Sequence, residues 1–205
     1  MQFRVWLGIL GLLCASAVYG AGDPEAGQAQ ALTCSACHGQ DGATGIDPTY
    51  PNLAGQNERY LFRQLQLIQF NERNILLMTG QLLGKTEQDL ADLAAYYASL
   101  PAKIDQASGD DAAITRAQGI YRGGILAKGV AACSACHSPI GGGNMPAGFP
   151  TLSGQSAAYT VAQLTAYREG RRATDEEYGG VMRDVAGTLT DGEIALLADY
   201  VQGLH

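Results

Sequence analysis

The sequence predicts an all-α protein that contains the same domain twice. Helix-start patterns recur along the chain, one long stretch is repeated at a fixed offset, and no segment alternates convincingly between apolar and polar residues. The apolar fraction of 46% suffices for a packed core, while 27 glycines and only 7% aromatic residues indicate small units with tight turns. The formal net charge of −7 argues against nucleic acid or an anionic membrane surface as a partner.

Residues 1–20 have the pattern of a secretory signal peptide. Arg4 precedes an apolar stretch over 5–13, and small residues lead to a cleavage site that we place after Gly20. A retained membrane anchor is the alternative, but the apolar stretch is short for a membrane span. Cys14 would leave with the signal. We therefore expect an exported chain, which in a bacterium means a periplasmic one.

The rest of the chain contains one unit twice. Residues 34–38 recur as 133–137 at an offset of 99, and 51–56 match 150–155 at the same offset. The offset becomes 104 by Met182, so the second copy carries five extra residues somewhere after Leu164. Two copies indicate a duplication and not a solenoid, which needs at least three repeats. We expect a signal peptide over 1–20, domains over 21–104 and 105–205, and a linker at about 101–111.

The last segment of each copy gives the clearest helix. Thr86 and Asp89 form a capping-box pattern, and Thr190 and Glu193 begin the corresponding helix of the second copy. Apolar residues then follow at helical spacing, so each helix should bury one face. These are Leu90, Leu93, Ala94 and Tyr97 in the first copy, and Ile194, Leu197, Ala198 and Val201 in the second. Weaker helical patterns cover 24–32, 58–70, 112–121 and 157–168.

Each copy contains the motif Cys-x-x-Cys-His, which is the attachment sequence for a c-type haem. Two cysteines three residues apart on a helical turn point the same way and can add to the two vinyl groups of one porphyrin. The adjacent histidine then reaches the iron. The motifs therefore predict two covalently bound haem c groups, with Cys34, Cys37, Cys133 and Cys136 as attachment residues and His38 and His137 as proximal ligands.

Other uses of the four cysteines explain the sequence less well. Disulfides suit an exported chain but leave unexplained why a histidine follows each pair. A thioredoxin-like redox pair normally lies on a βαβ unit, for which the sequence gives no strand pattern. A structural zinc site needs four ligands, and each copy offers two cysteines and one histidine without an obvious fourth.

The sixth iron ligand decides what such a haem does, because a methionine there gives a closed electron-transfer centre. Met78 and Met182 each lie eight residues before the threonine that caps the last helix, and this equivalence favours them as distal ligands. Met145 aligns with Ile46 and is expected in a loop or at a haem edge. His205 is interpreted as a solvated terminus, although a bis-histidine second haem stays open.

Pro51 and Pro150 each lie 13 residues after the motif histidine. Their carbonyl groups could accept the proximal imidazole N–H and so fix its tautomer. A simple turn proline is an equal alternative.

The quoted motifs occur together with CSACHG, YPNLAGQ and DLAAYYASL in the first copy and YRGGILAKGVAACSACHS and FPTLSGQ in the second. This combination resembles the dihaem cytochrome c4 family over essentially the whole chain after residue 20. The resemblance implies two class I cytochrome c domains, each an all-α fold around one haem. It implies that they face each other about a pseudo-twofold axis, with haem propionates near the interface. It carries over the same attachment residues, the proximal ligands His38 and His137 and the distal ligands Met78 and Met182.

Two stretches depart from the family pattern. The second copy has Ser138 after its motif histidine, where glycine is usual. The first copy has Asn71, Glu72 and Arg73 where a Gly-x-Arg stretch is common, as in Gly170 to Arg172.

The family resemblance implies an electron carrier and not an enzyme. It would take electrons from a cytochrome bc complex or another dehydrogenase and pass them to a terminal oxidase, as a monomer with at most loose peripheral membrane association. Two alternatives are a dihaem subunit of a flavocytochrome-type sulfide dehydrogenase and a dihaem peroxidase. The paired Met78 and Met182 argue against the peroxidase, which needs one haem that can open.

Overall fold

The structure is a computed structural model that describes residues 21–205, so the predicted signal peptide lies outside the described residues. The described part is helical, as the sequence predicts. Its extended pairing is limited to two isolated bridges, Ile125 with Val130 and Asn144 with Phe149. Within residues 21–205 no helix has the length and apolar character needed to cross a membrane.

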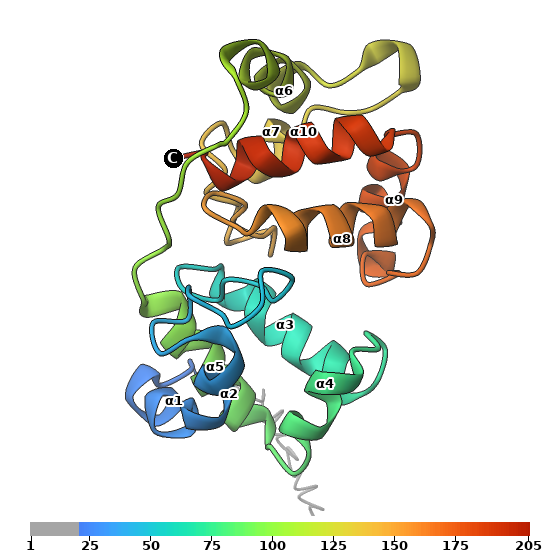
Figure 1. Cartoon of the computed structure of the whole chain (residues 1–205). Helices are drawn as coiled ribbons and strands as arrows, with labels where there is room; N and C mark the ends of the chain where they lie inside the picture. The colour runs from blue at the N-terminus through green and yellow to red at the C-terminus, as the bar shows by residue number, and fades with distance from the viewer. Residues whose placement is uncertain (1–20) are drawn as a thin grey trace, which may run out of the picture.

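The described chain forms two helical halves of similar design (Figure 1). In the first half α5 packs on α1 and α3, and in the second α10 packs on α6 and α8. The first half consists of α1 (Pro24–Gln30), α2 (Leu32–His38), α3 (Glu58–Gln69), α4 (Leu76–Thr79), η1 (Gly80–Leu82) and α5 (Glu87–Ser99). The second consists of α6 (Asp111–Gly123), η2 (Leu126–Lys128), α7 (Ser134–His137), α8 (Ala157–Arg168), η3 (Glu176–Tyr178), α9 (Val181–Ala186) and α10 (Asp191–Gln202).

Both predicted capping boxes are confirmed. Thr86 and Thr190 accept the N–H of Asp89 and Glu193, and each carboxylate accepts the N–H of its threonine in return. Glu193 also binds the Lys128 ammonium at 2.7 Å. Hydrogen bonds from Lys128 and from the Thr190 N–H hold the pKa of Glu193 down at about 2. The start of α10 is therefore tied to the loop after α6.

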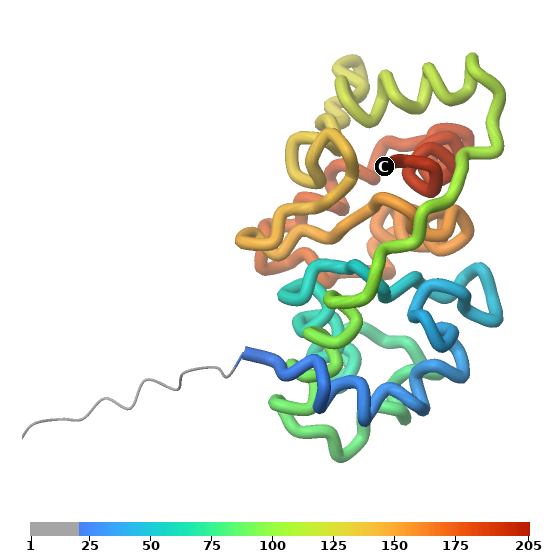
Figure 2. The backbone as a smooth tube through the Cα atoms, turned by 90° about the vertical axis from the view of Figure 1, so that its left-hand side faces the viewer, coloured from blue at the N-terminus to red at the C-terminus, as the bar shows by residue number. Residues whose placement is uncertain are grey.

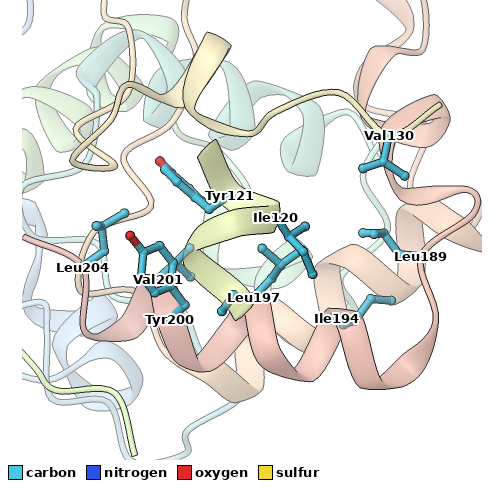
Figure 3. Packing of buried hydrophobic residues seen from close by; sticks show 10 residues of the cluster. Ile120, Tyr121, Val130, Leu189, Ile194, Leu197, Tyr200, Val201 and Leu204 are labelled. Carbon is cyan, nitrogen blue, oxygen red and sulfur yellow. The ribbon is translucent and has the colours of Figure 1, made fainter. Parts of the chain in front are cut away.

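The predicted apolar faces of α5 and α10 form the cores of the two halves. Leu90, Leu93 and Ala94 are buried in the first half. In the second half Leu197 and Val201 of α10 pack against Ile120 and Tyr121 of α6 (Figure 3). Each half thus has its own hydrophobic cluster, as expected for two domains in one chain.

A glycine lets α1 cross α5 at very short range. A Cβ atom on Gly27 would lie 2.0 Å from the carbonyl oxygen of Asp92, so only glycine fits there. The Asp92 side chain also accepts the N–H of Asp23 at 2.8 Å. Gly119 in α6, in contrast, has nothing within 4 Å of the place a Cβ would take.

The loop after α3 repeats closely after α8. Asn71 adopts a positive φ of 60° where Gly170 has 69°, because asparagine tolerates the left-handed region better than most residues. The Arg73 N–H then bonds the Leu67 carbonyl, and the Arg172 N–H bonds that of Ala166. The offset of 99 therefore holds as far as the two arginines. The five extra residues lie between Arg172 and Met182, in the segment that contains η3.

Ser138 likewise adopts the conformation that glycine has in the first copy. Its φ is 68°, against 83° for Gly39. The Ser138 hydroxyl accepts the N–H of Gly142 at 2.8 Å, which closes the turn locally. The second copy thus has serine in place of the usual glycine, but its backbone adopts a similar conformation at this position.

The two halves face each other through α3 and α8 (Figure 1). The segment from residue 101 to 110 contains no helix and runs along one side from the first half to the second (Figure 2). Its end is fixed to α10, since the Asp199 carboxylate accepts the N–H groups of Ser108 at 2.8 Å and Gly109 at 3.0 Å.

Candidate functional site

A cavity of about 930 Å³ is lined by both halves. Most of its lining is apolar, and residues from α3 and α8 contribute where the halves meet. It brings together every site residue that the sequence predicts. These are Cys34, Cys37, His38, Met78, Cys133, Cys136, His137 and Met182.

The four cysteines lie at the two short motif helices. Cys34 and Cys37 lie in α2. Cys133 is the N-cap residue of α7, and Cys136 lies within that helix. None of the four is paired in a disulfide. Burial raises the pKa of the Cys133 thiol to about 11. Within residues 21–205 no group of three His, Cys, Asp or Glu side chains is arranged to hold a metal ion.

The motif histidines are buried, and each forms a hydrogen bond through Nδ1 to a backbone carbonyl group. Nδ1 of His38 lies 3.0 Å from the Pro51 carbonyl oxygen, and Nδ1 of His137 lies 2.9 Å from that of Pro150. The carbonyl interpretation of the two prolines is therefore confirmed. Burial lowers the pKa of both imidazoles, and the carbonyl bond opposes this in part. A neutral ring whose Nδ1–H is engaged leaves Nε2 free as a metal ligand.

The two methionines occupy equivalent short helices on the cavity wall. Met78 lies in α4 and Met182 in α9. Met145 is 58% exposed. His205 is exposed, and its Nδ1 lies 3.0 Å from the Gly203 carbonyl oxygen. Neither of the last two residues is among those that line the cavity.

Two buried arginines meet where the halves face each other. Arg73 donates to Tyr159 of the other half at 2.9 Å, and Arg172 donates to Tyr60 at 2.8 Å. Both also donate to Gln64 and Gln163, so the two guanidinium groups share their acceptors. Neither forms an ion pair with a carboxylate of residues 21–205. Both line the cavity, which is thus suited to anionic groups.

The sequence analysis did not single out these arginines as functional. Extending the repeat alignment to Arg73 and Arg172 would have indicated both residues, because they are equivalent arginines that directly precede the change of offset. It also assigned Tyr97 only to a core face. The Tyr97 hydroxyl is buried without a hydrogen-bond partner among the described residues and lines the cavity. Tyr121 lines the cavity from α6 and donates to the Ser138 carbonyl at 2.7 Å.

These residues fit two haem groups. The cavity is apolar, two motif histidines present one free nitrogen each, and two buried cations suit haem carboxylates. Fold and site together define a two-domain c-type cytochrome. The cytochrome c family model matches residues 24–101 and again 126–205. Cytochrome c4 of Pseudomonas aeruginosa is 45% identical over 199 residues, which cover 97% of this chain and 94% of that protein. The chain belongs to the cytochrome c4 family.

Two further comparisons agree with this assignment. The crystal structure of reduced recombinant cytochrome c4 from Pseudomonas stutzeri matches with a TM-score of 0.85 and 46% identity, covering 90% of this chain and 100% of that one. A thiosulfate dehydrogenase electron acceptor of Thiomonas intermedia is 35% identical over 91% of this chain and 83% of its own length. The chain is thus a dihaem electron carrier with two covalently bound haem c groups, and it exchanges electrons with redox partners.

Proposed function

We propose that each haem of this carrier is held by one half of the chain. Cys34 and Cys37 form the thioether bonds of the first haem, and Cys133 and Cys136 form those of the second. His38 and His137 are the proximal ligands, and Met78 and Met182 are the distal ones. The observation that carries this assignment is that each motif histidine is bonded at Nδ1 to a proline carbonyl and lines the same cavity as an equivalently placed methionine.

The bound haems supply reversible Fe(II)/Fe(III) cycling, and the chain supplies the environment. The proline carbonyls orient the two imidazoles, and burial keeps the rings neutral. The thioether sulfur of a methionine would be a soft ligand that favours Fe(II) and raises the potential. The apolar lining excludes water from both iron sites. This arrangement suits fast electron transfer without ligand exchange.

We propose that the protein works in the periplasm after removal of residues 1–20, with one domain over 21–104 and the other over 105–205. Its donor would be a cytochrome bc complex or another dehydrogenase, and its acceptor a terminal oxidase. It would act as a monomer, free or loosely associated with the membrane. The relatives favour this carrier role over a flavocytochrome subunit or a peroxidase.

The Thiomonas relative supports one donor class in particular. That relative is named as the electron acceptor of a thiosulfate dehydrogenase, and it is similar to this chain over 91% of the length. A dehydrogenase of an inorganic sulfur compound is therefore our second candidate for the donor. Stopped-flow mixing with a reduced thiosulfate dehydrogenase should give haem reduction within milliseconds to seconds, and no reduction would remove this candidate.

The axial ligands are tested by the absorption spectrum of the purified protein. We expect two haems per chain, low-spin spectra in both oxidation states and a methionine-to-iron charge-transfer band at full two-haem intensity. Met78→Ala and Met182→Ala should each halve this band, and Met145→Ala is the matched control that should leave it intact. A high-spin component or half the band in the unmodified protein would contradict the assignment.

A further inference from the structure

The two halves hold each other through a reciprocal pair of glutamines. The Gln155 Oε1 accepts the N–H of Asn52 at 2.9 Å, and its Nε2 donates to the Asn52 carbonyl at 3.0 Å. The Gln56 side chain does the same to Thr151, at 2.7 Å and 2.9 Å. Both glutamines are 7% exposed. Each side-chain amide thus pairs with the backbone of the other half as a neighbouring strand would.

The orientation of both amides is fixed by a second bond. The Gln56 Oε1 also accepts the N–H of Asn57 at 2.8 Å, and the Gln155 Oε1 accepts that of Ser156 at 2.9 Å. An oxygen that receives two N–H groups cannot be exchanged with the NH₂ group without losing both bonds. The acceptor atom that faces the other half is therefore Oε1 in each case.

Each contacted N–H belongs to the peptide group that orients a proximal histidine. The Asn52 nitrogen is bonded to the Pro51 carbonyl carbon, and the Pro51 oxygen accepts from His38 Nδ1 at 3.0 Å. Peptide resonance links the two ends of this group, because a hydrogen bond at the N–H increases the negative charge on the oxygen. The same connection runs from Gln56 through the Pro150–Thr151 peptide to His137, whose Nδ1 lies 2.9 Å from the oxygen.

We propose that Gln56 and Gln155 are positioning residues that tune the haem of the opposite half. Gln155 of the second half polarises the peptide that binds His38, and Gln56 of the first half polarises the one that binds His137. A more polarised carbonyl makes the imidazole a stronger electron donor, which stabilises Fe(III) and lowers the potential. This inference rests on the proposed proximal roles of His38 and His137.

The experiment measures the two haem potentials separately in Gln155→Leu and Gln56→Leu. Loss of the Gln155 acceptor should raise the potential of the haem attached at Cys34 and Cys37. At a fixed solution potential, the ratio of Fe(II) to Fe(III) in that haem should rise by about two- to threefold. Gln56→Leu should do the same to the haem attached at Cys133 and Cys136. The two titration steps are assigned with the axial methionine variants described above.

A second readout separates tuning from a loss of structure. In ¹⁵N-histidine-labelled protein, the Nδ1–H resonance of His38 should move in Gln155→Leu and stay in Gln56→Leu. Asn52→Ala is the matched control, because it removes the side-chain bond from Asn52 to the Gly154 carbonyl, 2.8 Å, and keeps the backbone N–H. Gln155→Glu keeps an acceptor oxygen for the Asn52 N–H and makes it anionic, so it should lower the potential of the same haem, which keeps the test usable if the leucine variant does not fold.

An effect on the haem of the same half, an equal effect on both haems, or no shift at all would overturn the proposal. Asn52→Ala with the same shift as Gln155→Leu would also overturn it, since interface loosening would then suffice. These outcomes concern differences between variants. Failure of the axial assignment would instead appear in the spectrum of the unmodified protein, so the two failures are distinguishable.

Discussion

The two arginines between the halves are cations buried among neutral acceptors. Arg73 and Arg172 are each less than one-tenth exposed and bind tyrosine hydroxyls and glutamine oxygens. A buried cation costs several kcal/mol unless an anion or a full set of hydrogen bonds compensates it. The carboxylates of two haems are the counter-charge that this part of the cavity suits. The buried positive charge should then favour Fe(II) in both haems.

Arg73→Gln should lower the potentials of both haems, because a nearby positive charge is removed. We expect a shift of about 59 mV, which corresponds to a tenfold change in the ratio of Fe(II) to Fe(III). A spectroelectrochemical titration measures this. Arg63→Gln is the matched control, since Arg63 also crosses between the halves but is half-exposed and paired with Glu177 at 3.1 Å. Equal shifts in the two variants would show that net charge alone is responsible.

The sequence predicted the haem-binding residues better than it predicted the buried charges around them. The five-residue motif predicts the haem-binding cysteines and histidines, and the equivalence of the two repeats predicts the methionines. The arginine network could not be predicted, because Arg73 finds its acceptors Tyr159 and Gln163 in the other half. Only the packing of the two halves brings them together.

Among the elements of the first half, α1 and α5 approach each other closely at Gly27. Gly27→Ala should destabilise the protein by about 2 kcal/mol or more, because its Cβ would meet the backbone of Asp92 at 2.0 Å. Gly119→Ala, the same change in the open interior of α6, should stabilise by about 0.5–1 kcal/mol. Chemical unfolding measures both. Changes of the same sign would contradict the close crossing of α1 and α5.

The N-terminus of α10 should be sensitive to acid. Because the folded pKa of Glu193 is about 2 and its ordinary value is 4.5, the carboxylate stabilises the fold above pH 4.5. This contribution is lost as the pH falls from 4.5 towards 2. Glu193→Gln should remove that part of the pH dependence, which urea unfolding at several pH values measures. An unchanged pH profile would show that the Lys128 bond contributes nothing to stability.

A cap deletion tests the same helix at neutral pH. Thr190→Ala should cost about 1 kcal/mol, since the N–H of Glu193 loses its acceptor. Thr86→Ala is the matched variant in the first half, where the Asp89 carboxylate forms no ion pair with a lysine of residues 21–205. Thermal unfolding should show a loss in both, and a neutral result at either site would contradict the capping box there.

Helix boundaries followed from local sequence to within a few residues. The capping boxes predicted where α5 and α10 begin, and the apolar spacing predicted their buried faces. The short helices α4 and α9, which carry the methionines, were not predicted as helices, since four to six residues give too little periodicity. The position of the insertion also required the structure, because the matching N–H bonds of Arg73 and Arg172 show that the two backbones correspond up to that point.

The whole molecule carries a formal charge of −7, to which haem carboxylates would add. Electron exchange with a basic partner protein should therefore slow by about tenfold or more between roughly 10 and 300 mM ionic strength. Stopped-flow rates measure this, and a neutral small-molecule reductant is the control that should show little change. A rate that rises with salt would indicate that the docking surface is basic.

The reciprocal contacts of Gln56 and Gln155 make the junction between the halves self-complementary. The same surface occurs on both sides and is related by a twofold operation, which is the symmetry of a homodimer. Such a surface closes on itself and forms pairs, not filaments. The segment 101–110 joins the two partners covalently and raises their effective concentration to the millimolar range. Few contacts are then enough to keep the two halves together. Because both copies lie in one chain, equivalent positions can carry different residues. Equivalent positions do differ, as Asn71 and Gly170 show, whereas a pair of identical chains would carry the same residue on both sides.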